Sequence, residues 1–268
     1  MYNFSENIQI MGILNLSPDS FYSDSKLSFS ERLSKLSSAD IIDIGAESSR
    51  PGALPVTSEV EIKRIQKILP FLSENQTELS IDTYKLKTVS FALNNGFTIV
   101  NDISGGQSPE MLNIIANHDA KIILMHMQGK PATMQINPLY DDVMVDIITF
   151  FEKTCERAIK AGINSNNIII DPGIGFGKTI SDNDEIIYNI SKLKSLGFPV
   201  LIGISRKSFL QYENDLPSDR LPATISVNTL SMLNGADIIR VHDVDEHIKI
   251  RAILSRMSRQ YSGEVNGY

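Results

Sequence analysis

The sequence predicts a single (β/α)₈ barrel, a TIM barrel, that spans residues 1–268 as one domain, and three observations support this prediction. Eight short apolar runs recur at intervals of roughly 30 residues, the length of one strand–helix unit. The runs are continuous rather than alternating, as is typical of parallel strands buried on both faces. Each run ends in polar residues suited to binding or catalysis, and such barrels place their functional groups just after the carboxyl ends of the strands.

In chain order, each apolar run is a predicted strand, and each following segment with apolar residues at helical spacing is a predicted helix. The predicted strands are residues 8–14, 40–45, 78–82, 97–101, 121–125, 167–170, 199–203 and 237–241. The predicted helices are residues 29–37, 57–71, 85–95, 108–117, 140–161, 183–195, 221–234 and 244–258. Two strand-to-helix connections, 16–28 and 46–55, are long and rich in Ser, Pro, Asp and Gly, which predicts lids over a functional site.

Composition argues against several classes of protein. The formal net charge of −7 disfavours a general nucleic-acid-binding surface, which needs a basic face. The N-terminal sequence MYNFSENIQI lacks the basic and long apolar segments of a signal peptide, and no apolar run reaches membrane-spanning length. The single cysteine, Cys155, rules out an internal disulfide and lies in a helical core stripe, so we expect a packing role for it and a cytoplasmic protein.

Three polar side chains, Asp82, Asn101 and Asp171, follow the third, fourth and sixth predicted strands. Buried carboxylates need hydrogen-bond donors, whereas an amide both donates and accepts. The set therefore suits a flat heterocycle with an amide-and-amine edge, such as a 2-amino-4-oxopyrimidine ring. A metal pair is the rival explanation for several acids, although no His/Glu spacing typical of transition-metal ligands supports it. The Asp-Pro-Gly sequence at 171–173 is also a common turn, but the further glycines around Phe176 exceed what one turn needs.

Cations gather at the ends of other predicted strands. Lys207 and Ser208 follow the seventh strand, Arg240 and His242 follow the eighth, and Arg50 lies in the second long connection. The loops after strands seven and eight are the usual phosphate site of this barrel, and arginine binds phosphate oxygens in a bidentate manner. The sequence therefore predicts an anion site at this end of the barrel.

Three neighbouring side chains are not assigned to the site. Arg206 and Lys178 are interpreted as solvated surface charges, because a single basic residue near a loop usually has no further role. His126 follows the fifth predicted strand and is equally consistent with a hydrogen-bonded core histidine. We therefore leave all three out of the catalytic set.

Taken together, eight motifs resemble those of the dihydropteroate synthase family: MGILNLSPDSF, DIGAESSRPGA, SIDTYK, NDISGG, LMHMQG, DPGIGFGKT, SRKSFL and RVHD. They occur in order over practically the whole chain. The resemblance implies an enzyme that joins 6-hydroxymethyl-7,8-dihydropterin pyrophosphate to 4-aminobenzoate, giving dihydropteroate and pyrophosphate. It also implies Mg²⁺ as a cofactor, sulfonamides as inhibitors and a homodimer as the assembly.

The resemblance further implies a role for each candidate residue. The pterin would be bound by Asp82, Asn101, Ile103, Met125, Asp171, Phe176, Gly203 and Lys207. Pyrophosphate would be bound by Asn15, Arg50, Arg240 and His242, with Asn15 also a ligand of Mg²⁺. Aminobenzoate would be bound by Phe21, Ser49, Pro51, Lys207 and Ser208. The catalytic set would be Asp82, Lys207, Arg240 and His242.

The chemistry implied by the family makes sense of these residue types. An arylamine is neutral at pH 7 and attacks without a strong base, so the difficulty lies in the departure of pyrophosphate. Mg²⁺, Arg50, Arg240 and His242 would stabilise the charge that grows on it. Asp82 would favour a cationic methylene beside the pterin, as in a dissociative, SN1-like substitution.

The sequence also departs from the family pattern. The first long connection reads DSFYSDS over 19–25, with one residue inserted and both glycines of the common Ser-Asp-Gly-Gly missing, so Asp24 is given no role. Ser49 stands where Thr is common and keeps the hydroxyl. The sequence at 107–109 has no sign of the Phe-Gly-type insertion of sulfonamide-resistant relatives, which predicts a drug-sensitive type.

Two alternatives stay open. Pterin-dependent methyltransferases share the barrel and its pterin-binding acids, but they hold no pyrophosphate and lack the SRKS and RVHD cations found here. The other alternative is a paralogue that binds pterin without synthesis, and the altered first connection is its only support. Turnover by the purified protein distinguishes these functions.

Overall fold

The computed structural model describes residues 7–17, 27–47, 54–72, 77–129 and 133–262. Within these ranges, parallel strands form one eight-stranded sheet in the order β6-β5-β4-β3-β2-β1-β8-β7. The strands are β1 (Gln9–Asn15), β2 (Ile41–Gly45), β3 (Glu78–Asp82), β4 (Ile99–Asp102), β5 (Lys121–Met125), β6 (Ile168–Asp171), β7 (Leu201–Ile202) and β8 (Ile238–Val241). The two edges meet where Ile170 bridges Val200 and donates its N–H to the carbonyl of Pro199 at 2.9 Å. The sheet is therefore a nearly closed barrel, which confirms the predicted fold.

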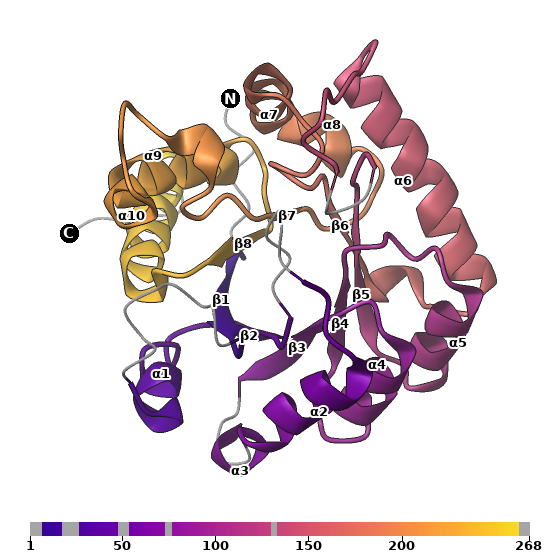
Figure 1. Ribbon diagram of the computed structural model, residues 1–268. Coiled ribbons are helices and arrows are strands. Elements are labelled where there is room, and N and C mark those ends of the chain that lie inside the picture. Colours follow the sequence, from indigo (N-terminus) through magenta and orange to yellow (C-terminus); the bar gives the residue numbers. More distant parts are fainter. Residues whose placement is uncertain (1–6, 18–26, 48–53, 73–76, 130–132, 263–268) are drawn as a thin grey trace.

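Helices surround the strands, as Figure 1 shows. The α-helices are α1 (Phe29–Ser34), α2 (Ser58–Gln66), α3 (Leu69–Leu72), α4 (Leu86–Leu93), α5 (Pro109–Asn117), α6 (Val143–Lys160), α7 (Ile180–Tyr188), α8 (Ile190–Lys194), α9 (Leu221–Leu233) and α10 (Val244–Ser262). The 3-10 helices are η2 (Ser165–Asn167), η3 (Ser208–Leu210) and η4 (Pro217–Arg220). In the described part of the chain, no helix is both long and apolar enough to cross a membrane.

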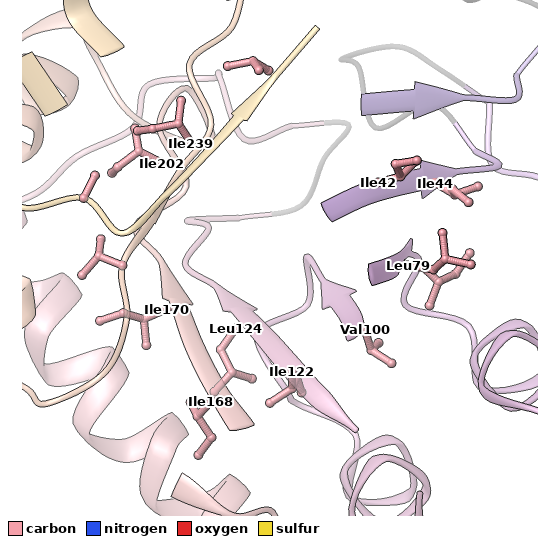
Figure 2. Packing of buried hydrophobic residues seen from close by; sticks show 14 of the residues in the cluster. Ile42, Ile44, Leu79, Val100, Ile122, Leu124, Ile168, Ile170, Ile202 and Ile239 are labelled. Atoms are coloured by element: carbon pink, nitrogen blue, oxygen red, sulfur yellow. The ribbon is translucent and has the colours of Figure 1, made fainter. Parts of the chain in front are cut away.

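The strands contribute to two separate cores because successive side chains point to opposite faces of a strand. The outward set packs beneath the helices, and Figure 2 labels examples such as Val100, Ile122 and Ile168. Cys155 on α6 belongs to this outer core, in agreement with its predicted packing role. The inward set forms a second buried cluster: Met11, Ile41, Ile99, Ile123, Ile169, Leu201 and Ile238. The inward cluster fills the barrel below the site.

The polar site lies one layer above this inward cluster. Two positions further along a strand, the side chain points inward again, now at the carboxyl end. On β2, β4, β6 and β8, this step leads from an isoleucine of the inward cluster to Asp43, Asn101, Asp171 and Arg240. The alternation of the strands therefore builds a polar floor directly on top of an apolar one.

Three of the differences from the sequence-based boundaries have a clear local cause. The helix predicted over 57–71 is divided, because the ring of Pro70 conflicts with the carbonyl of Gln66, where α2 ends. The strand predicted over 199–203 is restricted to β7, since Pro199 has no N–H to donate to a ladder. The helix predicted from residue 183 begins earlier, at α7, because Thr179 and Asp182 form a capping box.

Candidate active site

A buried carboxylate organises the polar floor. Asp43 on β2 has no solvent exposure and accepts hydrogen bonds from β3, β4 and β8. Its Oδ1 accepts from the Ser80 hydroxyl at 2.6 Å, and its Oδ2 accepts from Nδ2 of Asn101 at 3.1 Å and from Nε of Arg240 at 2.6 Å. Arg240 also donates from Nη2 to Oδ2 of Asp82 at 2.8 Å. The network therefore brings three of the predicted site residues together, on β3, β4 and β8.

Burial dominates the electrostatics of this network. It raises the pKa of the Asp82 carboxyl to about 7, with Arg240 pulling in the opposite direction and Asp43 adding to the rise. Burial also opposes the charge on Arg240, but Asp43 and Asp82 outweigh it and raise the pKa of the guanidinium. Arg240 thus stays charged, and only two of the five N–H groups of its guanidinium are used in these two bonds.

The loop after β6 places a second carboxylate beside a lysine. Oδ1 of the buried Asp171 accepts the N–H of Gly173 at 2.7 Å, so the Asp-Pro-Gly turn is real but uses one carboxylate oxygen. Burial raises the pKa of Asp171, and nearby Lys207 opposes that shift. Nζ of Lys207 donates to the carbonyl of Ile174 at 2.5 Å and lies 4.5 Å from the centre of the Phe176 ring. Burial lowers the pKa of Lys207 to about 8.

Lys178 is not a solvated surface charge, and that prediction is wrong. Its side chain is 3% exposed, and Nζ lies 3.0 Å from Nδ1 of His126. Nζ also donates to the carbonyls of Gly173 at 3.1 Å and Phe176 at 3.0 Å, so it ties the loop after β6 to the end of β5. Burial lowers the pKa of Lys178 to about 7. Burial and the charge of Lys178 lower the pKa of His126 to about 3, so His126 is a neutral core histidine.

The predicted anion site lies after β8. Nδ1 of His242 lies 3.0 Å from the hydroxyl of Ser205, and this hydroxyl also accepts the backbone N–H of His242 at 3.2 Å. When the hydroxyl donates to Nδ1, the ring proton is carried by Nε2, where it can be donated to an anion. A cavity of about 310 Å³ opens beside His242, and its charged lining includes both cations and carboxylates: Arg32, Lys35, Arg206, Asp243, Asp245 and Glu246.

Arg206 is the second wrongly predicted surface charge. Its Nε and Nη2 pair with the two carboxylate oxygens of Asp243 at 2.8 and 2.5 Å. Its Nη1 donates to two backbone carbonyls at the start of η4. The guanidinium therefore joins the loop after β7, which carries Lys207, to the loop after β8, which carries His242.

The remaining predicted residues fall into two groups. Met125 is paired with Asp171 across β5 and β6, and Gly203 lies beside Arg240, since a Cβ at Gly203 would be 3.7 Å from that of Arg240. Ile103 is buried just after β4, whereas Ser208 is exposed at the start of η3. The others lie outside the described residues: Phe21, Asp24, Ser49, Arg50 and Pro51.

Sequence reasoning missed Asp43 and Ser80, which hold the network together. The signal was present, because Asp43 interrupts the apolar run IIDIG at a position where a buried strand gains nothing from a charge. Asp102, by contrast, has a structural role, because its carboxylate binds the backbone of the following turn. Its carboxylate accepts the N–H groups of Ser104 and Gly106 at 2.8 and 2.9 Å, and so fixes the turn after β4.

Asn15 is the predicted magnesium ligand, and its surroundings fit that role. In the regions that the structure describes, no three or more His, Cys, Asp or Glu side chains gather as a metal site. A Cβ at Gly45 would lie 3.2 Å from Oδ1 of Asn15 and 3.7 Å from Oδ2 of Asp82, so the Asn15 amide faces the polar floor. Mg²⁺ commonly uses few protein oxygens and completes its shell with waters and substrate phosphates. A single amide oxygen near the predicted anion site suits that mode of binding.

Comparison with known proteins adds to this geometry. The family model described as "Pterin binding enzyme" matches residues 11–242. The chain is 37% identical over 244 residues to a dihydropteroate synthase from Haemophilus influenzae, covering 88% of this chain and 89% of that protein. A dihydropteroate synthase from Yersinia pestis, solved as a sulfonamide drug complex, has a TM-score of 0.88, 37% identity and 95% coverage of both chains.

Two further matches define the extent of the similarity. The dihydropteroate synthase of Xanthomonas albilineans with 4-aminobenzoic acid has a TM-score of 0.86 and 32% identity, covering 94% of this chain and 93% of that one. A "probable bifunctional folylpolyglutamate synthase/dihydropteroate synthase" from Haloferax volcanii is 36% identical over 253 residues. The match covers 92% of this chain but only 30% of that longer protein.

Proposed function

Because the chain belongs to the dihydropteroate synthase family of pterin-binding enzymes, we propose that it condenses 6-hydroxymethyl-7,8-dihydropterin pyrophosphate with 4-aminobenzoate. The products are 7,8-dihydropteroate and pyrophosphate. The protein is accordingly a transferase of folate synthesis. The observation that carries the proposal is that Arg240, a candidate for binding pyrophosphate, is hydrogen-bonded to Asp82, a candidate for binding the pterin, and to Asp43.

The pterin is proposed to lie between the carboxylates of Asp82 and Asp171. Asp171 gives one oxygen to Gly173, which leaves the other to accept from the amine and ring N–H of the pterin. The amide oxygen of Asn101 is available to a donor, because its Nδ2 is engaged by Asp43. Lys207 is proposed to donate to the oxo edge of the ring, with the face of Phe176 packed nearby. In this arrangement Asp171 and Asn101 accept hydrogen bonds from the pterin, and Lys207 donates one to it.

Departure of pyrophosphate is proposed to be the difficult step. Arg240 has N–H groups beyond the two that it donates to Asp43 and Asp82, and His242 is proposed to carry its ring proton on Nε2, with Nδ1 accepting from Ser205. Both would stabilise the negative charge that grows as the C–O bond breaks. Arg50 is proposed as a further cation. Mg²⁺ held by Asn15 would supply additional positive charge to the pyrophosphate oxygens.

The other half of the proposed mechanism is stabilisation of the cationic methylene. When ionised, Asp82 adds a negative charge close to the pterin, and this charge favours a carbocation over a neutral ring. The arylamine then attacks the methylene carbon and loses a proton. This is the dissociative, SN1-like course, with the floor carboxylates and the strand-eight cations acting on opposite ends of the breaking bond.

The aminobenzoate site is proposed to form last. Lys207 and Ser208 supply its inner edge, and Phe21, Ser49 and Pro51 would close over it from the two long connections. Bound pyrophosphate, together with Mg²⁺, would supply contacts for Asn15 and Arg50 as well as for the strand-eight cations, so that aminobenzoate binds after it. A labelled sulfonamide should therefore bind appreciably only when pyrophosphate and Mg²⁺ are present. Equal affinity in their absence would contradict this order of binding.

Turnover tests the proposed function directly. The purified protein, given the pterin pyrophosphate, 4-aminobenzoate and Mg²⁺, should release dihydropteroate and pyrophosphate in equal amounts. Asp171→Asn is the inactive control, and Asp119→Asn, an exposed substitution beyond the amino end of β5, is the active one. A protein that binds a pterin analogue but releases no pyrophosphate would instead be the non-synthetic paralogue.

Two further properties are proposed from family membership. A homodimer is expected, and sedimentation of the purified protein at several concentrations would test it. A cytoplasmic location is also proposed, and it agrees with the single cysteine, Cys155, which is buried and unpaired. Fractionation of cells that express the tagged full chain would check the location.

A further inference from the structure

Asp43 has no role in the contacts proposed so far, yet it touches two residues that do. We propose that Asp43 is a positioning residue for the reaction, which fixes the guanidinium of Arg240 and the amide of Asn101 in the orientations that the substrate requires. The inference rests on the proposed function. It assigns to Asp43 no contact with substrate.

The geometry explains how one side chain can set two others. Oδ2 of Asp43 accepts from Arg240 and from Asn101, which stand on β8 and β4, on different sides of the floor. Oδ1 accepts from Ser80 on β3, so the carboxylate is fixed at both oxygens and cannot rotate freely. A displacement of Asp43 therefore moves a pterin-binding amide and an anion-binding guanidinium together.

Burial separates the task of Asp43 from that of Asp82. Both carboxylates pair with Arg240, but the side chain of Asp43 is 0% exposed, whereas that of Asp82 is 15% exposed. Only Asp82 can therefore meet a ligand at the mouth of the barrel. When a substrate engages Asp82, Asp43 is the described carboxylate that still holds Arg240 in place.

A negative charge, and not only a polar group, is needed at this position. Asn in place of Asp43 keeps the shape of the side chain but not its charge. With its oxygen toward Ser80, its NH₂ group faces Nε of Arg240 and Nδ2 of Asn101, which are both donors. With the amide turned the other way, its oxygen can accept from both, but these bonds lose their charged acceptor, and hydrogen bonds with charged partners are roughly twice as strong as neutral ones.

The variant to test is therefore Asp43→Asn, with Asp40→Asn as its matched control. Asp40 also pairs with an arginine, Arg251, but at the opposite end of β2. Asp43→Asn should lower kcat by roughly ten- to a hundredfold, because small misplacements of binding groups cost about that much. The KM for aminobenzoate should change little. Asp40→Asn should leave kcat within about twofold of the wild type, as for most substitutions away from the site.

The pH dependence of kcat/KM distinguishes a positioning role of Asp43 from a general contribution to the stability of the fold. Asp82 is faced by Arg240 on β8, Asp43 on β2, Glu61 on α2 and Asp102 on β4, and its charge also acts on Lys207. Removing the charge of Asp43 removes a repulsion that raises the pKa of Asp82. The fall in kcat/KM on the acid side should therefore move to lower pH in Asp43→Asn. A substitution that only weakens the fold leaves that limb where it is.

The outcomes are distinct. Asp43→Asn with wild-type kcat, or with a lower kcat and an unmoved acid limb, would overturn the positioning role. If Asp43→Asn does not fold, Ser80→Ala removes one anchor of the carboxylate, and a wild-type kcat in that folded variant would also overturn it. If the wild type itself shows no turnover, the proposed function fails instead. The positioning role is then judged by calorimetry with a pterin analogue, where Asp43→Asn should weaken binding and Asp40→Asn should not.

Discussion

Arg240 on β8 reaches across the mouth of the barrel to Asp82 on β3, with 2.8 Å between Nη2 and Oδ2, although the two residues are 158 positions apart in the chain. The same guanidinium pairs with Asp43. Arg240 is therefore part of the polar floor as well as of the predicted anion site, whereas His242 belongs only to the predicted anion site.

This difference predicts different effects for two alanine substitutions. Arg240→Ala leaves the buried carboxylate of Asp43 and the partly buried carboxylate of Asp82 without their cation, so it should lower the free energy of unfolding by about 3–5 kcal/mol. It should also weaken both pterin and pyrophosphate binding. His242→Ala should weaken pyrophosphate binding by about 1.5–3 kcal/mol and spare the pterin. Denaturant unfolding and calorimetry measure these effects, and equal losses of pterin affinity in both variants would contradict the assignment.

Asp171→Asn should fold normally yet lose pterin affinity. The amide oxygen of the new side chain can still accept the N–H of Gly173, while its NH₂ group would face the donors of the pterin edge. Loss of a charge-assisted pair with an unsatisfied donor should cost about 2–4 kcal/mol of binding. Calorimetry with a pterin analogue checks this, and unchanged affinity in a folded variant would remove Asp171 from the site.

Lys178→Met should change how stability depends on pH. Because burial lowers the pKa of Lys178 from 10.5 to about 7 in the folded protein, the unfolded chain binds more protons between these values. The free energy of unfolding therefore rises with pH through this window, and the variant should lose part of that rise. The effect of Lys178 is clearest between pH 7 and 8. Burial lowers the pKa of Lys207 to about 8, so at higher pH the deprotonation of Lys207 also raises the free energy of unfolding. Identical slopes in the two proteins would show that Lys178 titrates normally.

The loop that follows Asp171 requires glycine at position 173. Gly173 has a φ of 66°, and a Cβ there would lie 2.0 Å from the carbonyl oxygen of His126. Gly197 also has a positive φ, of 85°, but nothing lies within 4 Å of its Cβ position. Gly197→Ala should cost about 1–2 kcal/mol of stability from strain alone. Gly173→Ala should cost more than about 3 kcal/mol and also weaken pterin binding, as thermal unfolding and calorimetry would show.

Much of the fold could be predicted because parallel strands buried on both faces leave an unmistakable pattern of apolar runs. The errors occurred where a local feature overrides that pattern. Pro70 ends α2 and Pro199 shortens β7, because neither can donate a backbone hydrogen bond. Both prolines are visible in the sequence, but their exact effect depends on which partner strand or helical turn meets them.

The site was less predictable than the fold. Residues at strand ends could be grouped, since the carboxyl ends of the strands share one face of the barrel. The burial of Lys178 and the pairing of Arg206 with Asp243 could not be predicted, because each depends on contacts between segments that are far apart in the sequence. Asp43 was overlooked for a related reason. Its partners Ser80, Asn101 and Arg240 come from three other strands and become neighbours only when the barrel closes.

Positional isotope exchange tests the proposed dissociative departure of pyrophosphate most directly. The pterin pyrophosphate would carry ¹⁸O in the bridge between carbon and phosphorus, and it would be incubated with the protein and Mg²⁺ without aminobenzoate. If the floor and the strand-eight cations allow the C–O bond to break before attack, return of the pyrophosphate should move label into the non-bridging oxygens. Arg240→Ala should exchange far more slowly. A wild-type protein that releases pyrophosphate only with aminobenzoate, and scrambles no label without it, would contradict the proposed mechanism.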